Sequence, residues 1–401
     1  MHSHKLLNPL AHAGLKVPPK LELEASIRRV IDEAGGWIDF ARFMSLALYD
    51  PESGYYSAQS QQIGESALTQ SDFVTAPQLT SAFGRALSVS VGEALENTQT
   101  DEVWEFGPGT GELAAQLLRT LGSKISKYNL VELSGTLQVR QRKRLSAYAD
   151  KVNWVSELPS FMRGVVIGNE VLDALPVNVL KRVDGVWYEQ GVCWKQNAGE
   201  HGAFEWVGRE TALRPPIEKG FTGDYLTEIH PQAQALIKTL VQRMSGELRY
   251  VPGNEPSSES GNKEKAKGAM IFLDYGFPEA EYYHPQRHMG TLMCHLRHVA
   301  DDNPLALVGH KDITAHVDFT GVALAAQEAG ANVLGYTSQA NFLLNTGFLD
   351  ALEDADQSER AKALKVIHEH EMGELFKVLV LGVGVSWDPL GCVRGDRTHT
   401  L

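Results

Sequence analysis

The sequence has few cysteines and no long apolar run, and each shortage excludes a class of protein. Only three cysteines occur among 401 residues, at positions 193, 294 and 392. They are far apart and form no CxxC pair, which argues against a disulfide framework and against a structural zinc site. The apolar run VLVLGVGV near the C-terminus is far shorter than the roughly 20 residues of a membrane-spanning helix. We expect no membrane insertion and a reducing compartment.

Basic charge is also scarce. The net charge of −13 argues against a protein that binds nucleic acid through general attraction to phosphates. A local basic patch is compatible with the sequence, and an example is the cluster of Arg140, Arg142, Lys143 and Arg144. We interpret this cluster as the solvated face of a helix. The N-terminus has neither the apolar core of a signal peptide nor the Arg-rich pattern of a transit peptide. We therefore predict a cytoplasmic protein without a nucleic-acid partner.

Apolar residues, by contrast, make up 43% of the chain, enough for a substantial core. From Val103 onward strands and helices alternate, which is typical of an α/β fold with a parallel sheet covered by helices on both faces. The strand candidates are VWEF, YNLVEL, VNWV, VVIG, AMIFLDYG and NVLGYT, with helices predicted over ELAAQLLRTL, over 136–149 and over 319–329 with Asp318 as its cap.

The alternation of strands and helices does not extend over the whole chain, and this predicts three regions. Residues 1–96 are predicted to be an N-terminal helical extension with a long polar loop after Pro51, and residues 97–400 a main α/β domain. An inserted α+β region is predicted over 179–267. It begins with antiparallel strands that turn at Asp184-Gly185, continues as helix over 213–244 and ends in a polar loop over 251–268.

The glycine-rich segment EFGPGTGE, residues 105–112, raises two cofactor hypotheses. A dinucleotide fingerprint has the spacing G-x-G-x-x-G, with its third glycine inside the helix. Counted from Gly107 and Gly109, that position is Glu112. A carboxylate in the first helical turn would repel a pyrophosphate where the helix dipole should attract it. The residues therefore disfavour NAD.

The observed spacing is G-x-G-x-G, through Gly107, Gly109 and Gly111, with Glu105 before it. This pattern is typical of class I methyltransferases that use S-adenosylmethionine (AdoMet), whose amino group and sulfonium are compatible with nearby acids. Glycines allow the backbone to approach such a ligand closely. Glu132, 21 residues past Gly111, ends the next strand, where a carboxylate can accept both ribose hydroxyls. The predicted cofactor-binding residues are Glu105, Gly107, Pro108, Gly109, Gly111, Glu132 and Asn169.

Two acids follow the buried strand VVIG. In open α/β sheets ligands bind beyond the carboxyl ends of the strands, so Asn169, Glu170 and Asp173 should face the same crevice as the glycine-rich turn. An ordinary capped or solvated loop would also contain such acids. Beside an AdoMet site, two carboxylates could hold a cationic nucleophile such as a guanidinium, whose planar donors match acids well.

Together these motifs resemble the MidA family, which includes the mitochondrial complex I assembly factor 7. The resemblance runs from about Ile27 to Arg397 and is carried by YDPESGYYS, SDFVTAP, EFGPGTGELA, GNEVLDALPV, LDYG, GTLMCHLRH, KDITAHVDFT and GYTSQANFLLNTG. It implies a class I methyltransferase fold with a Rossmann-like sheet. For mitochondrial members it also implies symmetric dimethylation of a protein arginine during complex I assembly, and by extension a protein substrate from a respiratory NADH-quinone oxidoreductase.

The sequence departs from the family pattern at two motifs. Ser71 stands where glycine is usual and Gln78 replaces an acid, which puts an acidic role at position 78 in doubt. Val171 and Leu172 replace a usual aromatic pair after Glu170, which would alter the wall of the pocket without touching the carboxylates.

The hypothesis is direct methyl transfer to a guanidinium nitrogen, with catalysis by alignment and electrostatics. Glu170, Asp173, Asn169 and His316 are the predicted catalytic residues. His316 is equally compatible with packing beneath a helix capped by Asp318. The other histidines between 284 and 316 lack a zinc-binding motif, so no metal is predicted. A non-catalytic AdoMet-binding assembly factor and a small-molecule methyltransferase are the alternatives.

Overall fold

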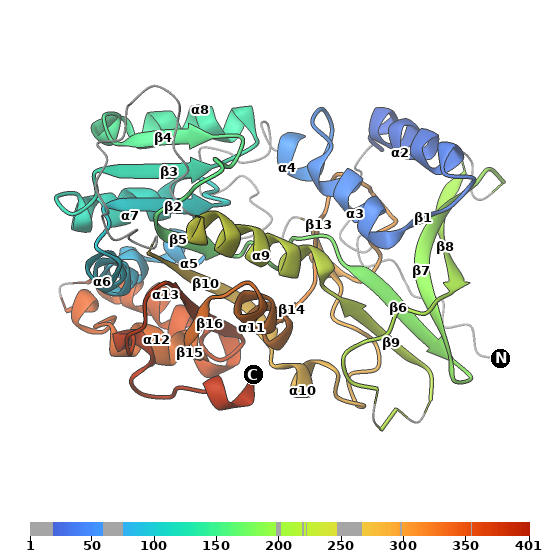
Figure 1. Cartoon of the computed structure of the whole chain (residues 1–401). Helices are drawn as coiled ribbons and strands as arrows, with labels where there is room; N and C mark the ends of the chain where they lie inside the picture. The colour runs from blue at the N-terminus through green and yellow to red at the C-terminus, as the bar shows by residue number, and fades with distance from the viewer. Residues whose placement is uncertain are drawn as a thin grey trace, which may run out of the picture. The chain divides into compact units, whose positions relative to one another are not determined.

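A computed structural model describes residues 19–58, 75–197, 202–218, 220–221, 223–246, 267–296, 299–353 and 355–401 of the chain (Figure 1). The chain forms two compact units. Unit 1 comprises residues 1–74, 174–230 and 283–316, and unit 2 comprises 75–173, 231–282 and 317–401. Position 71 and most of the polar loops predicted after Pro51 and over 251–268 lie outside the described residues.

Unit 2 is built on a mostly parallel sheet with the strand order β15-β16-β10-β5-β2-β3-β4. Its strands are β2 (Glu102–Phe106), β3 (Lys127–Val131), β4 (Val152–Val155), β5 (Gly164–Asn169), β10 (Gly268–Phe277), β15 (Asn332–Ser338) and β16 (Phe376–Val383). Among the described residues, β16 runs antiparallel to both of its neighbours, β10 and β15, and the other pairs along this order are parallel. A parallel sheet with one antiparallel strand inserted near its edge defines the class I methyltransferase topology, so the predicted fold class is confirmed.

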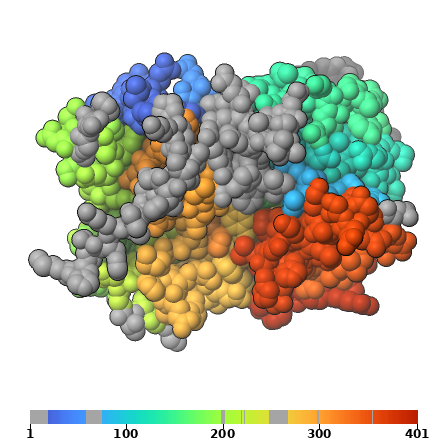
Figure 2. Space-filling view, turned by 180° about the vertical axis from the view of Figure 1, so that it is seen from behind, coloured from blue at the N-terminus to red at the C-terminus, as the bar shows by residue number. Residues whose placement is uncertain are grey.

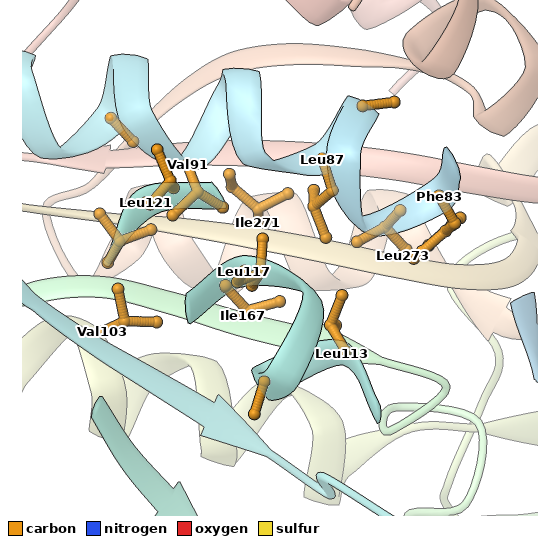
Figure 3. Packing of buried hydrophobic residues seen from close by; sticks show 14 of the residues in the cluster. Phe83, Leu87, Val91, Val103, Leu113, Leu117, Leu121, Ile167, Ile271 and Leu273 are labelled. Carbon is orange, nitrogen blue, oxygen red and sulfur yellow. The ribbon is translucent and has the colours of Figure 1, made fainter. Parts of the chain in front are cut away.

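Helices cover the sheet because their apolar residues recur at helical spacing. Figure 3 shows α6 (Ser81–Thr98) and α7 (Glu112–Leu121) packed over β2, β5 and β10. Leu87 of α6, Leu117 of α7 and Ile271 of β10 belong to one fully buried apolar cluster. The other helices of unit 2 are α5 (Ala76–Leu79), α8 (Gly135–Arg144), α9 (Pro231–Ser245), α10 (Glu279–Tyr282), α11 (Phe319–Glu328), α12 (Gln339–Asn345) and α13 (Gln357–Ile367).

Unit 1 contains two small sheets and a group of N-terminal helices. The larger sheet has the order β1-β7-β6-β9, with β8 paired to β7, and the smaller has the order β12-β11-β13. A separate apolar core joins the helices to these sheets through residues such as Phe43, Val192 and Ile313. The elements are α2 (Leu21–Glu33), β1 (Ile38–Asp39), α3 (Phe40–Tyr49), α4 (Tyr55–Ala58), β6 (Asn178–Val183), β7 (Val186–Lys195), β8 (Ala203–Glu210), β9 (Tyr225–Ile229), β11 (Met293–Leu296), β12 (Val299–Asp301) and β13 (Asp312–Thr314).

The structure confirms some local predictions and corrects others. Asp184 and Gly185 have φ of 48° and 86°, as a type I′ hairpin turn between β6 and β7 requires. The helix predicted over 213–244 is wrong in its first half, because β9 pairs with β6 and the helix begins only at Pro231. The chain first passes from unit 1 to unit 2 between residues 74 and 75, whereas the boundary was predicted between residues 96 and 97. The difference arises because α6 packs on the sheet of unit 2. Within the described residues no helix is long and apolar enough to cross a membrane.

Candidate functional site

The glycine turn, Gly107 to Gly111, connects β2 to α7. Gly107, Gly109 and Gly111 have φ of 58°, 51° and 75°, a left-handed conformation that costs other residues roughly 1–2 kcal/mol each. Gly111 is also the N-cap of α7, and the N–H of Gly111 donates to the carbonyl of Pro108 at 2.8 Å. The turn thus presents backbone with no side chains at three of its five positions.

Gln141 of α8 connects this turn to Glu132. The side-chain amide of Gln141 donates to the carbonyl of Gly109 at 2.8 Å and to Glu132 Oε2 at 3.1 Å, while Glu132 Oε1 accepts from the Ser134 N–H at 2.7 Å. Trp154 donates in turn to Gln141 Oε1 at 2.9 Å. Burial raises the pKa of Glu132, and these donors act against that rise. Gln141 was not predicted as a site residue, because nothing in its local pattern distinguishes it from other polar residues of a basic helix.

Glu105 is buried within unit 2. Its Oε2 accepts a 2.6 Å hydrogen bond from the Tyr128 hydroxyl on the neighbouring strand β3. Burial raises the pKa of Glu105 to about 7, partly opposed by this bond. The carboxylate of Glu105 is therefore hydrogen-bonded within the chain itself. A contact between Glu105 and the cofactor stays a prediction.

Gln78, the residue that replaces an acid of the family pattern, also reaches the glycine turn. Its side-chain nitrogen donates to the Thr110 hydroxyl at 3.2 Å, and its side-chain oxygen accepts from the N–H of Thr75 at the start of α5. An amide can do both because it is donor and acceptor. Glu112 is paired with Arg144, so its charge is partly compensated and excludes a pyrophosphate less strongly than the sequence suggested.

A polar cavity of about 400 Å³ lies beside α5 and the first turn of α7. In Figure 2 the blue segment that contains α5 adjoins the red C-terminal segments of unit 2. The residues that line the cavity are Pro77, Gln78, Leu79, Thr80, Ser81, Glu112, Gln116, Asp356, Ser358, Glu359 and Lys362. None of the predicted cofactor-binding residues is among them, and we therefore do not assign the cofactor to this cavity.

The NEVLD turn, Asn169 to Asp173, follows β5, the parallel neighbour of β2. Glu170 has a φ of 55°, which is uncommon for a residue other than glycine. The Asn169 amide donates to Glu170 Oε1 at 3.1 Å, and the buried Oδ1 of Asn169 accepts no hydrogen bond from the described residues. Asp173 is 4% exposed. The structure thus brings Asn169, Glu170 and Asp173 together in one turn.

Asp274 of β10, part of the LDYG motif, supports this turn and was missed. Its buried Oδ2 accepts hydrogen bonds from the backbone N–H groups of Val171, Leu172 and Asp173. The only signal in the sequence was that LDYG matches the family. Val171, one of the residues that depart from the family pattern, lies against the glycine turn: a Cβ added at Gly107 would meet Val171 Cγ2 at 3.2 Å. Leu172 is fully buried.

His316 lies in unit 1, apart in the chain from the other predicted catalytic residues. Its backbone N–H donates to the Thr291 hydroxyl at 3.1 Å, and this hydroxyl donates to the buried Glu228 at 3.0 Å. His230 is close enough for His316 to affect it: burial, and then His316, lower the pKa of His230 to about 3. Asp318 does cap α11, accepting from the Gly321 N–H. A catalytic role for His316 stays a prediction.

The arrangement of unit 2 is chemically suited to AdoMet. The glycine turn lacks side chains at three of its five positions, Glu132 supplies a buried carboxylate at the end of the next strand, and Asn169 Oδ1 accepts no hydrogen bond from the described residues. Together with the strand order, these features define a class I AdoMet-dependent methyltransferase.

Comparison with known proteins gives the family. Residues 87–337 match the family described as "Putative S-adenosyl-L-methionine-dependent methyltransferase", and the chain belongs to it. A Burkholderia thailandensis protein described as a "likely methyl transferase", solved with bound S-adenosyl-homocysteine, is 41% identical with a TM-score of 0.85, covering 96% of this chain and 100% of that one. The chain is an AdoMet-dependent methyltransferase, and AdoMet is its cofactor.

Curated relatives extend the comparison to eukaryotes. The chain is 24% identical to "Protein arginine methyltransferase NDUFAF7 homolog, mitochondrial" of Caenorhabditis elegans, over 95% of this chain and 90% of the relative. It is 26% identical to "Protein arginine methyltransferase NDUFAF7, mitochondrial" of Xenopus tropicalis, over 85% and 81%. The resemblance found in the motifs is thereby confirmed. The predicted cytoplasmic location is contradicted, because these relatives are mitochondrial.

Proposed function

We propose that this methyltransferase modifies a guanidinium nitrogen of a protein arginine, by symmetric dimethylation. The main support is that the turn after β5 carries Glu170 and Asp173 together, next to the strand that leads into the glycine turn. The names of the relatives as protein arginine methyltransferases support the same acceptor. A subunit of a respiratory NADH-quinone oxidoreductase is the proposed substrate, through the family resemblance.

In the proposed mechanism the chain binds and orients the acceptor. Glu170 and Asp173 would accept hydrogen bonds from the guanidinium and localise its charge on the nitrogens that they hold, leaving another nitrogen free to attack. AdoMet, when bound, would supply an electrophilic methyl group to the free nitrogen and would retain the electron pair of the broken C–S bond on sulfur. Because arginine stays protonated at neutral pH, the nitrogen would release its proton to solvent during or after transfer.

The test uses the full chain with labelled AdoMet and extract from cells that lack the protein. We expect the label in a protein of the extract, on an arginine identified by mass spectrometry as symmetrically dimethylated. Label confined to the low-mass fraction would contradict the proposal and indicate a small-molecule acceptor. Label on lysine or on a carboxyl group would keep the methyltransferase but exclude the arginine assignment.

A further inference from the structure

The NEVLD turn has an unusual support. The backbone N–H groups of Val171, Leu172 and Asp173 all point to a single atom, Oδ2 of Asp274, at 3.0, 2.8 and 3.3 Å. Successive N–H groups that follow a left-handed residue form a concave anion-binding site, and Glu170 supplies the left-handed conformation with its φ of 55°. A carboxylate of the protein itself therefore occupies this anion site.

The carboxylate of Asp274 is itself firmly held. Asp274 is 1% exposed and lies in β10, which pairs with β5 on one side and with β16 on the other. Its Oδ1 accepts from the N–H of Tyr275 at 3.0 Å, and the N–H of Glu170 donates to the carbonyl of Leu273 at 2.9 Å. The turn is thus attached to β10 at four successive residues, 170 to 173, and the side chain of Asp274 provides three of these attachments.

The charge of Asp274 would be costly to bury without compensation. Burial, followed by the nearby charge of Glu170, raises the pKa of Asp274 to about 7, while the three N–H groups of the turn oppose the rise. Replacement by a neutral residue would leave three buried N–H groups with a weaker acceptor or none. A negative charge kept next to Glu170 for packing alone would be unfavourable, which favours a role tied to the turn.

We infer that Asp274 is a positioning residue for methyl transfer. It fixes the backbone of residues 170–173 and thereby the orientation of the Glu170 and Asp173 side chains. This inference rests on the proposed function. Asp274 would not touch the acceptor or AdoMet. It would act through the geometry of the two acids, and a small misplacement of such groups is expected to slow transfer strongly.

The test is Asp274→Asn, which keeps the shape of the side chain and removes its charge. We expect amide hydrogen exchange, measured by mass spectrometry on peptides spanning 169–175, to become at least about tenfold faster. We expect kcat for labelling of the extract protein to fall by about 10- to 100-fold. The affinity for AdoMet, measured by calorimetry, should change by less than about threefold, since the glycine turn is untouched.

Val380→Ala is the matched control. Val380 is buried in β16, opposite Ile271 of β10, which lies three positions before Asp274 on that strand. It should lower the Tm without speeding exchange over 169–175 and without lowering kcat at temperatures where the variant is folded. An equal loss of kcat in Val380→Ala would show that general loosening of the sheet, and not the positioning by Asp274, controls the rate, and would overturn the inference.

Unchanged exchange and unchanged kcat in Asp274→Asn would also overturn it. If that variant does not fold, the wild type still decides: its 171–173 amides must exchange far more slowly than those of the exposed Asp184-Gly185 hairpin, and equal rates would refute the inference.

The two proposals can fail separately. If no arginine is labelled but Asp274→Asn loosens the turn, the arginine assignment falls and the structural attachment stands, whereas an arginine labelled equally fast by both proteins refutes the positioning role alone.

Discussion

The glycine turn and the NEVLD turn follow adjacent parallel strands, β2 and β5, and they reach a left-handed backbone by different means. The glycine turn uses three glycines with positive φ, so its conformation follows from its own residues. The NEVLD turn places Glu170 at a φ of 55° and is held by Asp274, about a hundred residues later. A turn that contacts a ligand through its backbone can be made of glycine. A turn that must carry acidic side chains needs support from another part of the chain.

A buried acid lies close to each turn, but the acids differ in their partners. Glu105 precedes the glycine turn and is bonded to the Tyr128 hydroxyl, while Asp274 is bonded to backbone N–H groups of the turn itself. Both have a pKa raised to about 7, in each case mainly by burial. Only Asp274 is in a position to fix the backbone of the turn beside it.

The largest effect is expected from Glu170→Gln, which removes an acid from the NEVLD turn and leaves the glycine turn unchanged. We expect methyl transfer to fall by about 100-fold or more, because a neutral amide no longer stabilises the cationic acceptor. Binding of AdoMet, measured by calorimetry, should stay near that of the wild type. Glu96→Gln, which alters an exposed ion pair with Lys124, is the control and should keep full activity. Full activity of Glu170→Gln on a verified substrate would remove Glu170 from the mechanism.

The second effect concerns pH and the acid near the glycine turn. The pKa of Glu105 is about 7 when folded and near its ordinary value of 4.5 when unfolded. Between about pH 4.5 and pH 7 only the folded state holds the proton on Glu105. The stability that Glu105 contributes is therefore present below about pH 4.5 and is lost as the pH rises through 7. The loss is on the order of 3 kcal/mol.

Glu105→Gln removes this titration and keeps an acceptor for Tyr128. The free energy of unfolding from urea titrations should therefore fall less between pH 5 and 8 in Glu105→Gln than in the wild type. Asp274 contributes a decline of the same sign, so some dependence on pH remains. Identical pH profiles for the two proteins would show that Glu105 does not titrate in this range.

These two turns also explain how far the sequence could be interpreted. The strand, glycine turn and helix from 102 to 121 were predicted correctly because the determinants are local: β propensity, glycine at positive φ and a helical apolar pattern. The support of the NEVLD turn could not be predicted, because Asp274 pairs with it only through the order of strands in the sheet. For the same reason β16 was overlooked, since the run VLVLGVGV carries no sign of its antiparallel place beside β10.

The inserted region shows a second limit of sequence interpretation. The helix predicted over 213–244 is correct only from Pro231 onward, and the residues directly before Pro231 form β9 instead. A five-residue strand such as β9 is too short to be distinguished by periodicity, and it is stabilised by pairing with β6. Tertiary pairing decided the outcome over local propensity.

A third, smaller effect tests the glycine turn directly. Gly111→Ala would place an alanine at a φ of 75°, with its Cβ 3.3 Å from Cγ of Gln141. This contact would displace the Gln141 amide that joins Gly109 to Glu132. We expect the affinity for AdoMet to fall by about tenfold, from strain of about 1–2 kcal/mol. Gly135→Ala is the matched control, because a Cβ there meets no atom within 4 Å and α8 tolerates alanine. Wild-type affinity in Gly111→Ala would mean that Gln141 adjusts freely.

The smallest effect measures the strain in the NEVLD turn by comparing Glu170→Ala with Glu170→Gly. Both variants lose the carboxylate, so the difference between them reports the backbone. At a φ of 55° the glycine variant should be more stable by about 1 kcal/mol, measured as a higher urea midpoint with an unchanged m value. At Glu359, within helix α13, the same pair should show the reverse order, since alanine is favoured over glycine there. Equal stabilities at position 170 would mean that the attachment to Asp274 and Leu273 does not enforce the left-handed conformation, and the contrast between the two turns would then lie only in their side chains.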